Sequence, residues 1–260
     1  MAISKNPWKI RGIKRNKSCI MKNYKKNLEL LKQNHIYSEE MEHDACGVGL
    51  VASTEGLKSR KVVEYGIDAL KAVWHRGAID ADGKTGDGAG IHIEIPKDFF
   101  EEKIEVTGHK HDNSELCVGM IFLPRNDYSA QEQCRTIVES ELTKRNFSIY
   151  GWRQVPVDPS VLGEKAEQTR PEITQVLFTY NDKKVVNKSL EQKLYETRRV
   201  IEKEALNNQL NNFYVCSFSS KSIIYKGVFL AEALSDFYTD LKDERFISRY
   251  AIFHLSLIHI

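Results

Sequence analysis

Apolar and polar positions repeat in two different patterns from residue 46 onward, one typical of strands and one typical of helices. Residues 46–53 form a short apolar run that predicts a strand. A helix follows, because apolar residues then recur at steps of four, three and four, and Gly77 is placed to end it. The apolar face of this helix comprises Val63, Ile67, Leu70 and Trp74. Between residues 91 and 95, isoleucines alternate with polar residues, which predicts a half-buried strand.

The second half of the chain carries the same two signals. The continuous apolar run 116–123 predicts a central strand, and residues 147–157 and 173–180 predict further strands. Residues 213–227 predict a hairpin that turns near Ser220, with short helical material after it. Two more helical faces are predicted, formed by Cys134, Ile137, Val138 and Leu142 and by Leu190, Leu194, Thr197, Ile201 and Ala205. Strands that neighbour strands, with helices segregated between them, indicate an α+β layered fold rather than a doubly wound parallel one.

Composition is that of an ordinary globular protein. Apolar residues make up 41% and charged residues 28% of the 260 positions. The chain contains no uninterrupted apolar window of about 18 residues, so no membrane-spanning helix is predicted. The five cysteines are scattered without a CxxC pair, which argues against a disulfide framework or a structural zinc site and favours the cytoplasm.

Charge is distributed unevenly along the chain. Residues 1–33 carry ten Lys or Arg against the single acid Glu29, although the formal net charge of the whole chain is only +2. The remainder is therefore mildly acidic, which argues against nucleic acid as its main partner. The basic segment lacks the apolar core of a secretory signal and predicts a solvated leader, with Met21 as an alternative start. A nucleic-acid-binding arm is the other interpretation of this segment.

Glycine is concentrated in residues 77–90, GAIDADGKTGDGAG. A Walker A loop needs four residues between its first glycine and the Gly-Lys-Thr, whereas five separate Gly77 from Gly83. A dinucleotide fingerprint is absent, because the later glycines give G-x-G-x-G and run into a strand. Lys84 stands where an EF-hand needs an oxygen ligand. The segment predicts a tight loop whose aspartates and lysine organise something polar.

Cys46 is the first candidate for chemistry. A cysteine followed by small residues at the entry to a strand is compatible with a buried core thiol. However, Trp74-His75-Arg76-Gly77 closes the following helix, and the glycine loop comes directly after it. The sequence therefore places a thiol, a guanidinium and flexible backbone within one short stretch, which favours a functional thiol.

Several motifs together resemble a known family. CGVGL at 46–50, WHRG at 74–77 and DGKTGDGAG at 82–90 are similar to the amino-terminal glutaminase domain of bacterial, NADPH-type glutamate synthase large subunits. The resemblance covers residues 42–254 and includes YGWRQVPVD (150–158), GEKAEQTRPEI (163–173), FYVCSFSSKSIIYKG (213–227) and FLAEALSDFY (229–238). It is specific to glutamate synthases, because other class II glutamine amidotransferases lack the glycine loop and these later blocks.

The resemblance implies an N-terminal nucleophile (Ntn) hydrolase fold, a four-layer αββα sandwich, here incomplete. It divides the chain into a leader or propeptide at 1–45, the first part of a class II glutaminase domain at 46–254 and a tail at 255–260. Cleavage before Cys46 makes that residue the mature N-terminus.

The implied reaction is hydrolysis of L-glutamine to glutamate and ammonia. The Cys46 thiolate attacks the side-chain amide, ammonia leaves, and water releases glutamate from the thioester. The α-amine of Cys46 is the implied base, because a free α-amine has a pKa of about 7.7–8 and can deprotonate a thiol whose pKa is near 8.5. Arg76 matches the family arginine that packs beside the nucleophile and orders the site. The alternative for Arg76 is a charge that stabilises the C-terminal end of its helix.

The other candidates are assigned simpler roles. His75 is expected to be structural, and Lys84 and Asp87 shape either the glutamine pocket or only the loop. Four acidic residues before the cleavage point are expected to keep the leader accessible: Glu39, Glu40, Glu42 and Asp44. Three cysteines are expected to be core thiols, because the family's iron–sulfur cysteines come from a much later region: Cys117, Cys134 and Cys216.

The parent enzyme implied by the resemblance passes the ammonia to a flavin domain. There 2-oxoglutarate and ammonia are reduced to glutamate with FMN and a 3Fe-4S cluster, and a small subunit with FAD and 4Fe-4S clusters delivers electrons from NADPH. None of these cofactor sites is expected within this segment, and neither nucleic acid nor a membrane is an expected partner. Two alternatives stay open: another class II amidotransferase with a different ammonia acceptor, and a catalytically silent scaffold.

The sequence departs from the family pattern after YAIFH at 250–254. The family continues with Gln-Arg-aromatic-Ser-Thr-Asn-Thr, whose arginine binds the glutamine α-carboxylate, and later supplies an Asn-Gly oxyanion hole and an Asp for the amino group. This chain instead reads LSLIHI, so residues 255–260 are interpreted as a non-native tail. Because a single oxyanion donor is worth about 10²–10³ in rate, the 260-residue chain is expected to lack glutaminase activity.

Overall fold

The computed structural model describes residues 26–30, 32–33, 46–111, 115–182 and 188–256. The chain divides into two units, residues 1–43 and residues 44–260. In the first unit, residues 26–30 and 32–33 are helical. Most of the predicted leader, including its acidic cluster, lies outside the described residues, as do residues 257–260 of the predicted tail. The fold that follows is that of the second unit.

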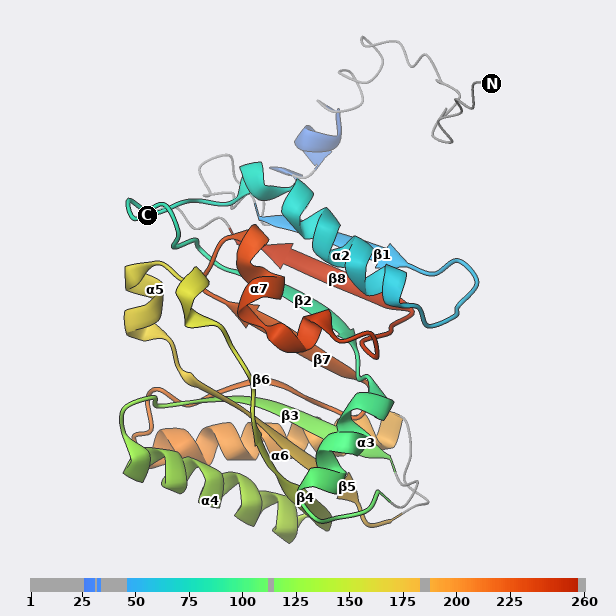
Figure 1. The fold of residues 1–260 in the computed structure, drawn as a ribbon, viewed down its shortest axis with the longest axis vertical. Coiled ribbons are helices and arrows are strands. Elements are labelled where there is room, and N and C mark those ends of the chain that lie inside the picture. The colour runs from blue at the N-terminus through green and yellow to red at the C-terminus, as the bar shows by residue number, and fades with distance from the viewer. Residues whose placement is uncertain (1–25, 31, 34–45, 112–114, 183–187, 257–260) are drawn as a thin grey trace. The chain divides into compact units, whose positions relative to one another are not determined.

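The first sheet is antiparallel and has the strand order β1-β8-β2-β7 (Figure 1). Its strands span Gly47–Ala52 (β1), Ala89–Glu94 (β2), Ser222–Gly227 (β7) and Tyr250–Leu255 (β8). β8 pairs with β1 on one side and β2 on the other, so the last strand holds the first one in the sheet. The strands predicted at 46–53 and 91–95 are confirmed as β1 and β2.

The second sheet is also antiparallel and has the order β4-β5-β3-β6. Its strands span Leu116–Leu123 (β3), Phe147–Gln154 (β4), Glu172–Tyr180 (β5) and Tyr214–Ser219 (β6). β3 is central, and seven of its eight residues are buried, because both faces of this strand are covered. The continuous apolar run at 116–123 is therefore a central strand, as predicted.

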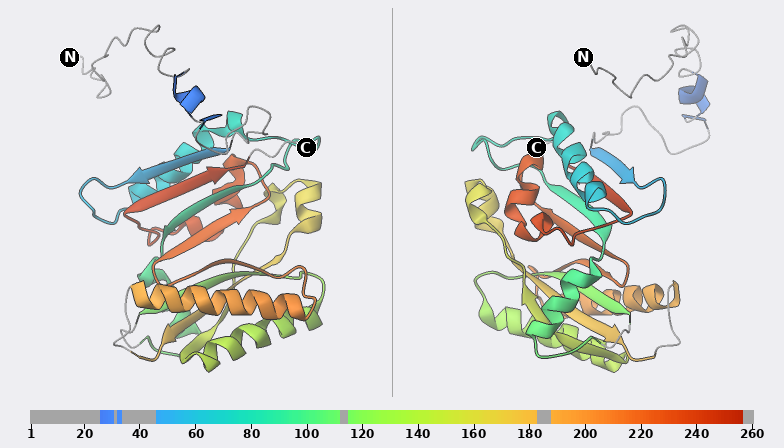
Figure 2. Two further views of the ribbon diagram at one scale, coloured as in Figure 1. Left: turned by 180° about the vertical axis from the view of Figure 1, so that it is seen from behind. Right: turned by 45° about the vertical axis from the view of Figure 1, so that its right-hand side comes forward.

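Helices cover one face of each sheet (Figures 1 and 2). α2 (Arg60–Ala72) packs on the first sheet so closely that a Cβ on Gly66 would lie 2.5 Å from the Ala251 methyl. α4 (Tyr128–Lys144) and α6 (Lys188–Asn207) pack against each other and against the second sheet. The shorter helices are α3 (Lys97–Val106), α5 (Glu164–Thr169), α7 (Leu234–Phe237), and the 3-10 turns η1 (Trp74–Arg76), η2 (Pro159–Val161), η3 (Ala231–Ala233) and η4 (Thr239–Lys242).

The buried apolar residues form two clusters. The smaller cluster fills the space between the second sheet and the two helices α4 and α6. It includes Cys117, Cys134 and Val215. The larger cluster joins α2, the first sheet, α3, α7 and the opposite face of β3. The helical faces predicted for α4 and α6 point into the smaller cluster, and all five residues predicted for α6 are buried.

Two sequence predictions need correction. β6 and β7 turn near Ser220 as expected, but they do not form a hairpin: β6 pairs with β3 in the second sheet and β7 pairs with β2 in the first. Trp74 does not extend the buried face of α2, because the helix ends at Ala72 and a 3-10 turn leaves the Trp74 ring 56% exposed. The mixed α/β composition with two antiparallel sheets agrees with the α+β expectation.

The first sheet has one face that no helix of the described residues covers (Figure 2, left). Residues alternate between its two faces, as in any strand. Ile91 and Ile93 point toward α2 and are buried, whereas Val48 and Leu50 lie on the opposite face and are 67% and 63% exposed. This uncovered face of the first sheet therefore presents accessible apolar side chains at the β1 edge.

Candidate functional site

Cys46 lies at the head of β1, the edge strand of the first sheet, and its side chain is partly exposed. The next residue, Gly47, pairs with Leu255 of β8. A Cβ placed on Gly47 would meet the Cγ2 of Val73 at 3.4 Å and the Cβ of Arg76 at 3.7 Å. The backbone that carries the thiol is thus packed directly beneath the turn after α2.

Arg76 ends that turn, and its amide donates to the carbonyl of Val73 at 2.8 Å. The side chain is exposed, and its guanidinium forms no ion pair within the described ranges. Its stem packs against the residue that follows Cys46. The structure therefore brings the two sequence-predicted site residues to the same end of the first sheet.

The glycine loop at 77–88 is held in shape by Asp82. Its Oδ1 accepts hydrogen bonds from the backbone amides of Lys84 and Thr85, at 2.9 and 2.7 Å, and its Oδ2 accepts one from the Thr85 hydroxyl at 2.5 Å. The Thr85 hydrogen bonds lower the pKa of Asp82 to about 2. Asp80 and Thr85 close the base of the loop through a backbone hydrogen bond at 2.9 Å. The loop is therefore an ordered turn with its own polar framework.

Helix α5 and the glycine before it contact this loop from the outside. Lys165 donates to both carboxylate oxygens of Asp80, at 2.9 and 2.7 Å, and this hydrogen bonding lowers the pKa of Asp80 and raises that of Lys165. Gly163 lies so close to the loop that a Cβ there would sit 2.2 Å from the Thr85 hydroxyl and 2.3 Å from Asp82 Oδ2. Two separate sequence motifs, DGKTGDGAG and GEKAEQTRPEI, are thus parts of one structural unit.

Strand register brings the remaining parts to the same end of the first sheet. Leu255 pairs with both Gly47 and Ala89, and Ala89 pairs with Gly227. Cys46, the end of the glycine loop and the end of β7 therefore lie along one end of the first sheet. A small hollow of about 20 Å³ beside them is lined by residues that include Trp74, Gly77, Asp87, Phe229 and Leu255.

Leu255 is the first residue of the segment interpreted as a non-native tail. It continues β8 and is 3% exposed, and the amide of Ser256 donates to the Gly88 carbonyl at 2.8 Å. These contacts give Leu255 a defined place next to the strand that follows Cys46. The origin of the segment 255–260 stays a prediction.

The other candidate residues from the sequence lie in different environments. His75 and Lys84 are exposed, with His75 edge-on to Trp74 at 6.4 Å, and Asp87 lines the hollow beside Gly77. The residues that sequence reasoning did not single out are Asp80, Asp82, Thr85, Gly163 and Lys165. The Asp82-Gly83 dipeptide is a turn signal that could have pointed to the first three.

The expectation of core thiols is confirmed. Cys117 and Cys134 are fully buried and Cys216 is 3% exposed. Burial raises the pKa of Cys134 to about 11 and that of Cys216 to about 12, and raises the pKa of Cys117 well above its usual range. Thiols that resist ionisation are poor metal ligands and poor nucleophiles.

The part of the chain that the structure describes does not fit an iron–sulfur cluster or another bound metal, since it contains no group of three or more His, Cys, Asp or Glu side chains arranged to hold an ion. Among the same residues, every helix is too short or too polar to cross a lipid bilayer.

Comparison with known proteins identifies the family. The model of the family described as "Glutamine amidotransferases class-II" matches residues 46–257. The large chain of NADPH glutamate synthase from Azospirillum brasilense is 54% identical over 231 residues, which are 89% of this chain and 15% of that protein. Ferredoxin-dependent glutamate synthase 2 of Synechocystis sp. is 37% identical over 82% of this chain, and the chloroplastic/mitochondrial ferredoxin-dependent glutamate synthase 1 of Arabidopsis thaliana is 38% identical over 82%.

The chain spans only 13–15% of the length of these relatives. The family match begins at Cys46, the residue at the head of β1, and it includes the Arg76 turn, the glycine loop and the α5 segment. The resemblance seen in the sequence is confirmed, and the chain belongs to the class II glutamine amidotransferases.

Proposed function

We propose that this chain supplies the first part of the glutaminase domain of a glutamate synthase large subunit, with L-glutamine as substrate. The observation that carries the proposal is the position of Cys46 at the head of β1, where the family match begins and where the Arg76 turn and the glycine loop converge. The two antiparallel sheets with helices on each support the Ntn-hydrolase sandwich as its fold.

The chemistry follows from a cysteine at a chain terminus. Hydrolysis of the peptide bond before Cys46 separates the leader at 1–45 and frees an α-amine. That amine removes the proton from the thiol, and the sulfur attacks the amide carbon of glutamine. The C–N bond breaks with proton transfer to the leaving nitrogen, which departs as ammonia. Water then hydrolyses the thioester to glutamate and returns the thiol.

Arg76 orders this site rather than reacting in it. Its stem packs on Gly47, so the guanidinium can limit the positions that the neighbouring Cys46 adopts. Exposure of the guanidinium keeps the charge solvated and available to the substrate side of the turn. A cation at this position also stabilises the C-terminal end of the α2 turn, and the two roles are compatible.

In the full-length enzyme, the ammonia reacts with 2-oxoglutarate, and reduction gives glutamate. FMN and a 3Fe-4S cluster in later parts of the large subunit would supply the reducing chemistry, and a small subunit with FAD and 4Fe-4S clusters would deliver electrons from NADPH. Similarity to both NADPH- and ferredoxin-dependent enzymes supports glutamate synthase as the parent. The free thiols at all four described cysteines support a cytoplasmic enzyme.

The decisive test is covalent labelling at Cys46. A diazoketone analogue of glutamine is incubated with the full-length gene product in a Cys19→Ser background, and mass spectrometry gives both the N-terminus and the adduct. We expect a protein that begins at Cys46 and carries one adduct, with protection by excess L-glutamine. The Cys46→Ser variant should keep its leader and carry no adduct, whereas Lys84→Ala should behave as the parent.

Each alternative predicts a different result. A silent scaffold would keep its leader and take up no label, and labelling that persists in Cys46→Ser would also refute the proposal. Another class II amidotransferase would be labelled at Cys46, but its full-length gene product would not form glutamate from glutamine, 2-oxoglutarate and a reductant.

A further inference from the structure

Helix α5 begins without a capping side chain of its own. Its N-cap position is Gly163, which has no side-chain group to accept a hydrogen bond from the first turn. The first amides of a helix have no partner within the helix, and a short polar side chain at the N-cap commonly accepts from one of them. A protein partner for the first turn of α5 therefore has to come from another segment of the chain.

The carboxylate of Asp82 lies at this position. A Cβ on Gly163 would be 2.3 Å from Asp82 Oδ2, so the carboxylate occupies the space that a capping side chain would fill. The backbone of Lys165, in the first turn of α5, also hydrogen-bonds the carboxylate, which helps to lower the pKa of Asp82 to about 2. Asp82 thus caps α5 from the glycine loop, and its negative charge suits the N-terminal end of a helix.

The two carboxylate oxygens of Asp82 have different neighbours. Oδ1 accepts from the amides of Lys84 and Thr85, so it holds the turn inside the glycine loop. Oδ2 accepts from the Thr85 hydroxyl and is the oxygen that faces Gly163. One side chain therefore connects the tip of the glycine loop with the start of α5.

The first end of the glycine loop continues directly from Arg76. Ile79 and Gly86 form an antiparallel bridge at the base of the loop. The amide of Gly77 donates to the carbonyl of Trp74 at 3.0 Å, within the turn that ends at Arg76. A movement of the loop is therefore transmitted to the turn that carries the guanidinium.

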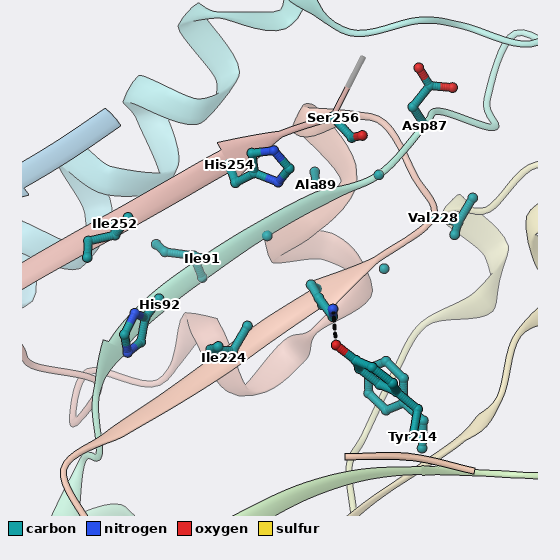
Figure 3. A pocket seen from close by; sticks show the side chains of 15 residues that line it. Asp87, Ala89, Ile91, His92, Tyr214, Ile224, Val228, Ile252, His254 and Ser256 are labelled. Carbon is teal, nitrogen blue, oxygen red and sulfur yellow. Dashed lines mark hydrogen bonds between the residues drawn. The ribbon is translucent and has the colours of Figure 1, made fainter. Parts of the chain in front are cut away.

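The second end of the glycine loop is held at β2. The Gly88 carbonyl accepts from the amide of Ser256, and Figure 3 shows Asp87 and Ser256 where the loop runs into this strand. Both ends of the loop are thus attached to the first sheet, and α5 holds the tip between them. The contact with α5 is the one that fixes the orientation of the loop.

We propose that Asp82 is a positioning residue of the glutaminase site, because it fixes the glycine loop against α5 and thereby keeps Arg76 beside Cys46. This inference rests on the proposed function, in which Arg76 orders the nucleophile. Without the cap, the tip of the loop leaves α5 and the Arg76 turn adopts further positions. A smaller fraction of the molecules is then ready to bind glutamine, whereas the thiol and its α-amine are unchanged.

Amide hydrogen exchange in the 260-residue chain tests the connection without relying on activity. Asp82→Asn keeps the shape of the side chain and the Oδ1 acceptor, but it places an N–H donor toward the Lys165 amide. We expect exchange to be about threefold or more faster at Lys165 and also at Gly77, because loss of an N-cap changes a local equilibrium by about 2–30-fold. Asp127→Asn makes the same change at the N-cap of α4 and should alter neither rate. An unchanged rate at either amide in Asp82→Asn would refute the inference.

Labelling of the full-length gene product tests the consequence for the site. The rate of Cys46 modification is measured against the concentration of the diazoketone analogue, which separates the half-saturating concentration from the limiting rate. We expect Asp82→Asn to raise the half-saturating concentration about threefold or more, with the limiting rate within about twofold and complete labelling at the end. Asp127→Asn should match the parent.

The outcomes separate this inference from the proposed function. A merely structural role of Asp82 would lower the labelled fraction and leave the half-saturating concentration unchanged, and either that result or equal behaviour of parent and Asp82→Asn overturns the inference alone. A parent that is not labelled at Cys46 overturns the proposed function as well. Thermal unfolding establishes that each variant is folded.

Discussion

Arg153 of β4 and Asp240 of η4 form a bidentate ion pair, with N···O distances of 2.7 and 2.6 Å. The Arg153 guanidinium also donates to Gln175 of β5, and the Tyr225 hydroxyl of β7 donates to Asp240 and accepts from Gln175. Burial raises the pKa of Tyr225 well above its usual range, so this phenol stays a neutral donor. The network connects strands of both sheets, and every member has a partner.

Breaking this pair should destabilise the protein strongly. Arg153→Met leaves the buried carboxylate of Asp240 without its cation, and such a loss costs about 3–5 kcal/mol. The free energy of unfolding from urea titration measures it. Lys242→Ala, which removes an exposed pair with Asp236, should cost less than about 1 kcal/mol. A loss in Arg153→Met no larger than that of Lys242→Ala would show that the network does not stabilise the fold.

Gly163→Ala should distort the glycine loop. The added methyl would overlap the Thr85 hydroxyl and the Asp82 carboxylate, both of which belong to the turn itself. Overpacking of this kind costs about 1–3 kcal/mol. Amide exchange of the loop measures the effect locally, and we expect faster exchange at Thr85. Gln168→Ala, on the exposed side of α5, is the matched control and should leave exchange at Thr85 unchanged.

The carboxylate of Asp82 should stay ionised to unusually low pH. Its folded pKa is about 2, below the ordinary value of 3.8, so its contribution to stability is present above pH 4 and is lost as the pH falls toward 2. Carbon-13 titration of the Asp82 carboxyl group measures this midpoint directly. Thr85→Val removes the hydroxyl donor and should raise the midpoint. An unchanged midpoint in that variant would assign the shift to the backbone amides alone.

Alkylation should distinguish Cys46 from the core thiols. In a Cys19→Ser background, iodoacetamide at pH 8 should modify the folded protein once, because Cys117, Cys134 and Cys216 are buried and burial raises the pKa of each thiol. Intact mass counts the adducts. The Cys46→Ser variant should then take up none when folded and three in denaturant. Rapid modification of a second thiol in the native protein would contradict the packing around α4 and β6.

Local periodicity is enough to predict most elements but not their partners. The residues from Leu190 to Ala205 fall on one face of α6 because a helix packs through its own repeat. β6 and β7 carry the alternation of a hairpin, yet two strands joined by a short turn show the same pattern when they enter different sheets. Strand pairing depends on residues that are far away in the sequence, so the local pattern of apolar and polar residues does not predict it.

In the candidate site, too, local motifs predict some features, whereas contacts between distant segments are not predicted. Cys46 and Arg76 stand in short motifs, and their approach to one end of the sheet follows from a strand, a helix and a turn. The contact of Gly163 with Thr85 joins distant segments, and a glycine required by close approach looks in sequence like any loop glycine. Burial of Leu255 likewise depends on its pairing with Gly47 and Ala89, which no local pattern reveals.

The pairing of β1 with β8 also determines when the first sheet can be completed during translation. All strands of the second sheet lie between residues 116 and 219, so that sheet can close while later residues are still being translated. β1 must wait for a partner about 200 residues downstream, which at roughly 5–20 residues per second means some 10–40 s on the ribosome. The strand that begins next to Cys46 is thus made first and placed last, and the thiol acquires its surroundings only when nearly all of this chain has been synthesised.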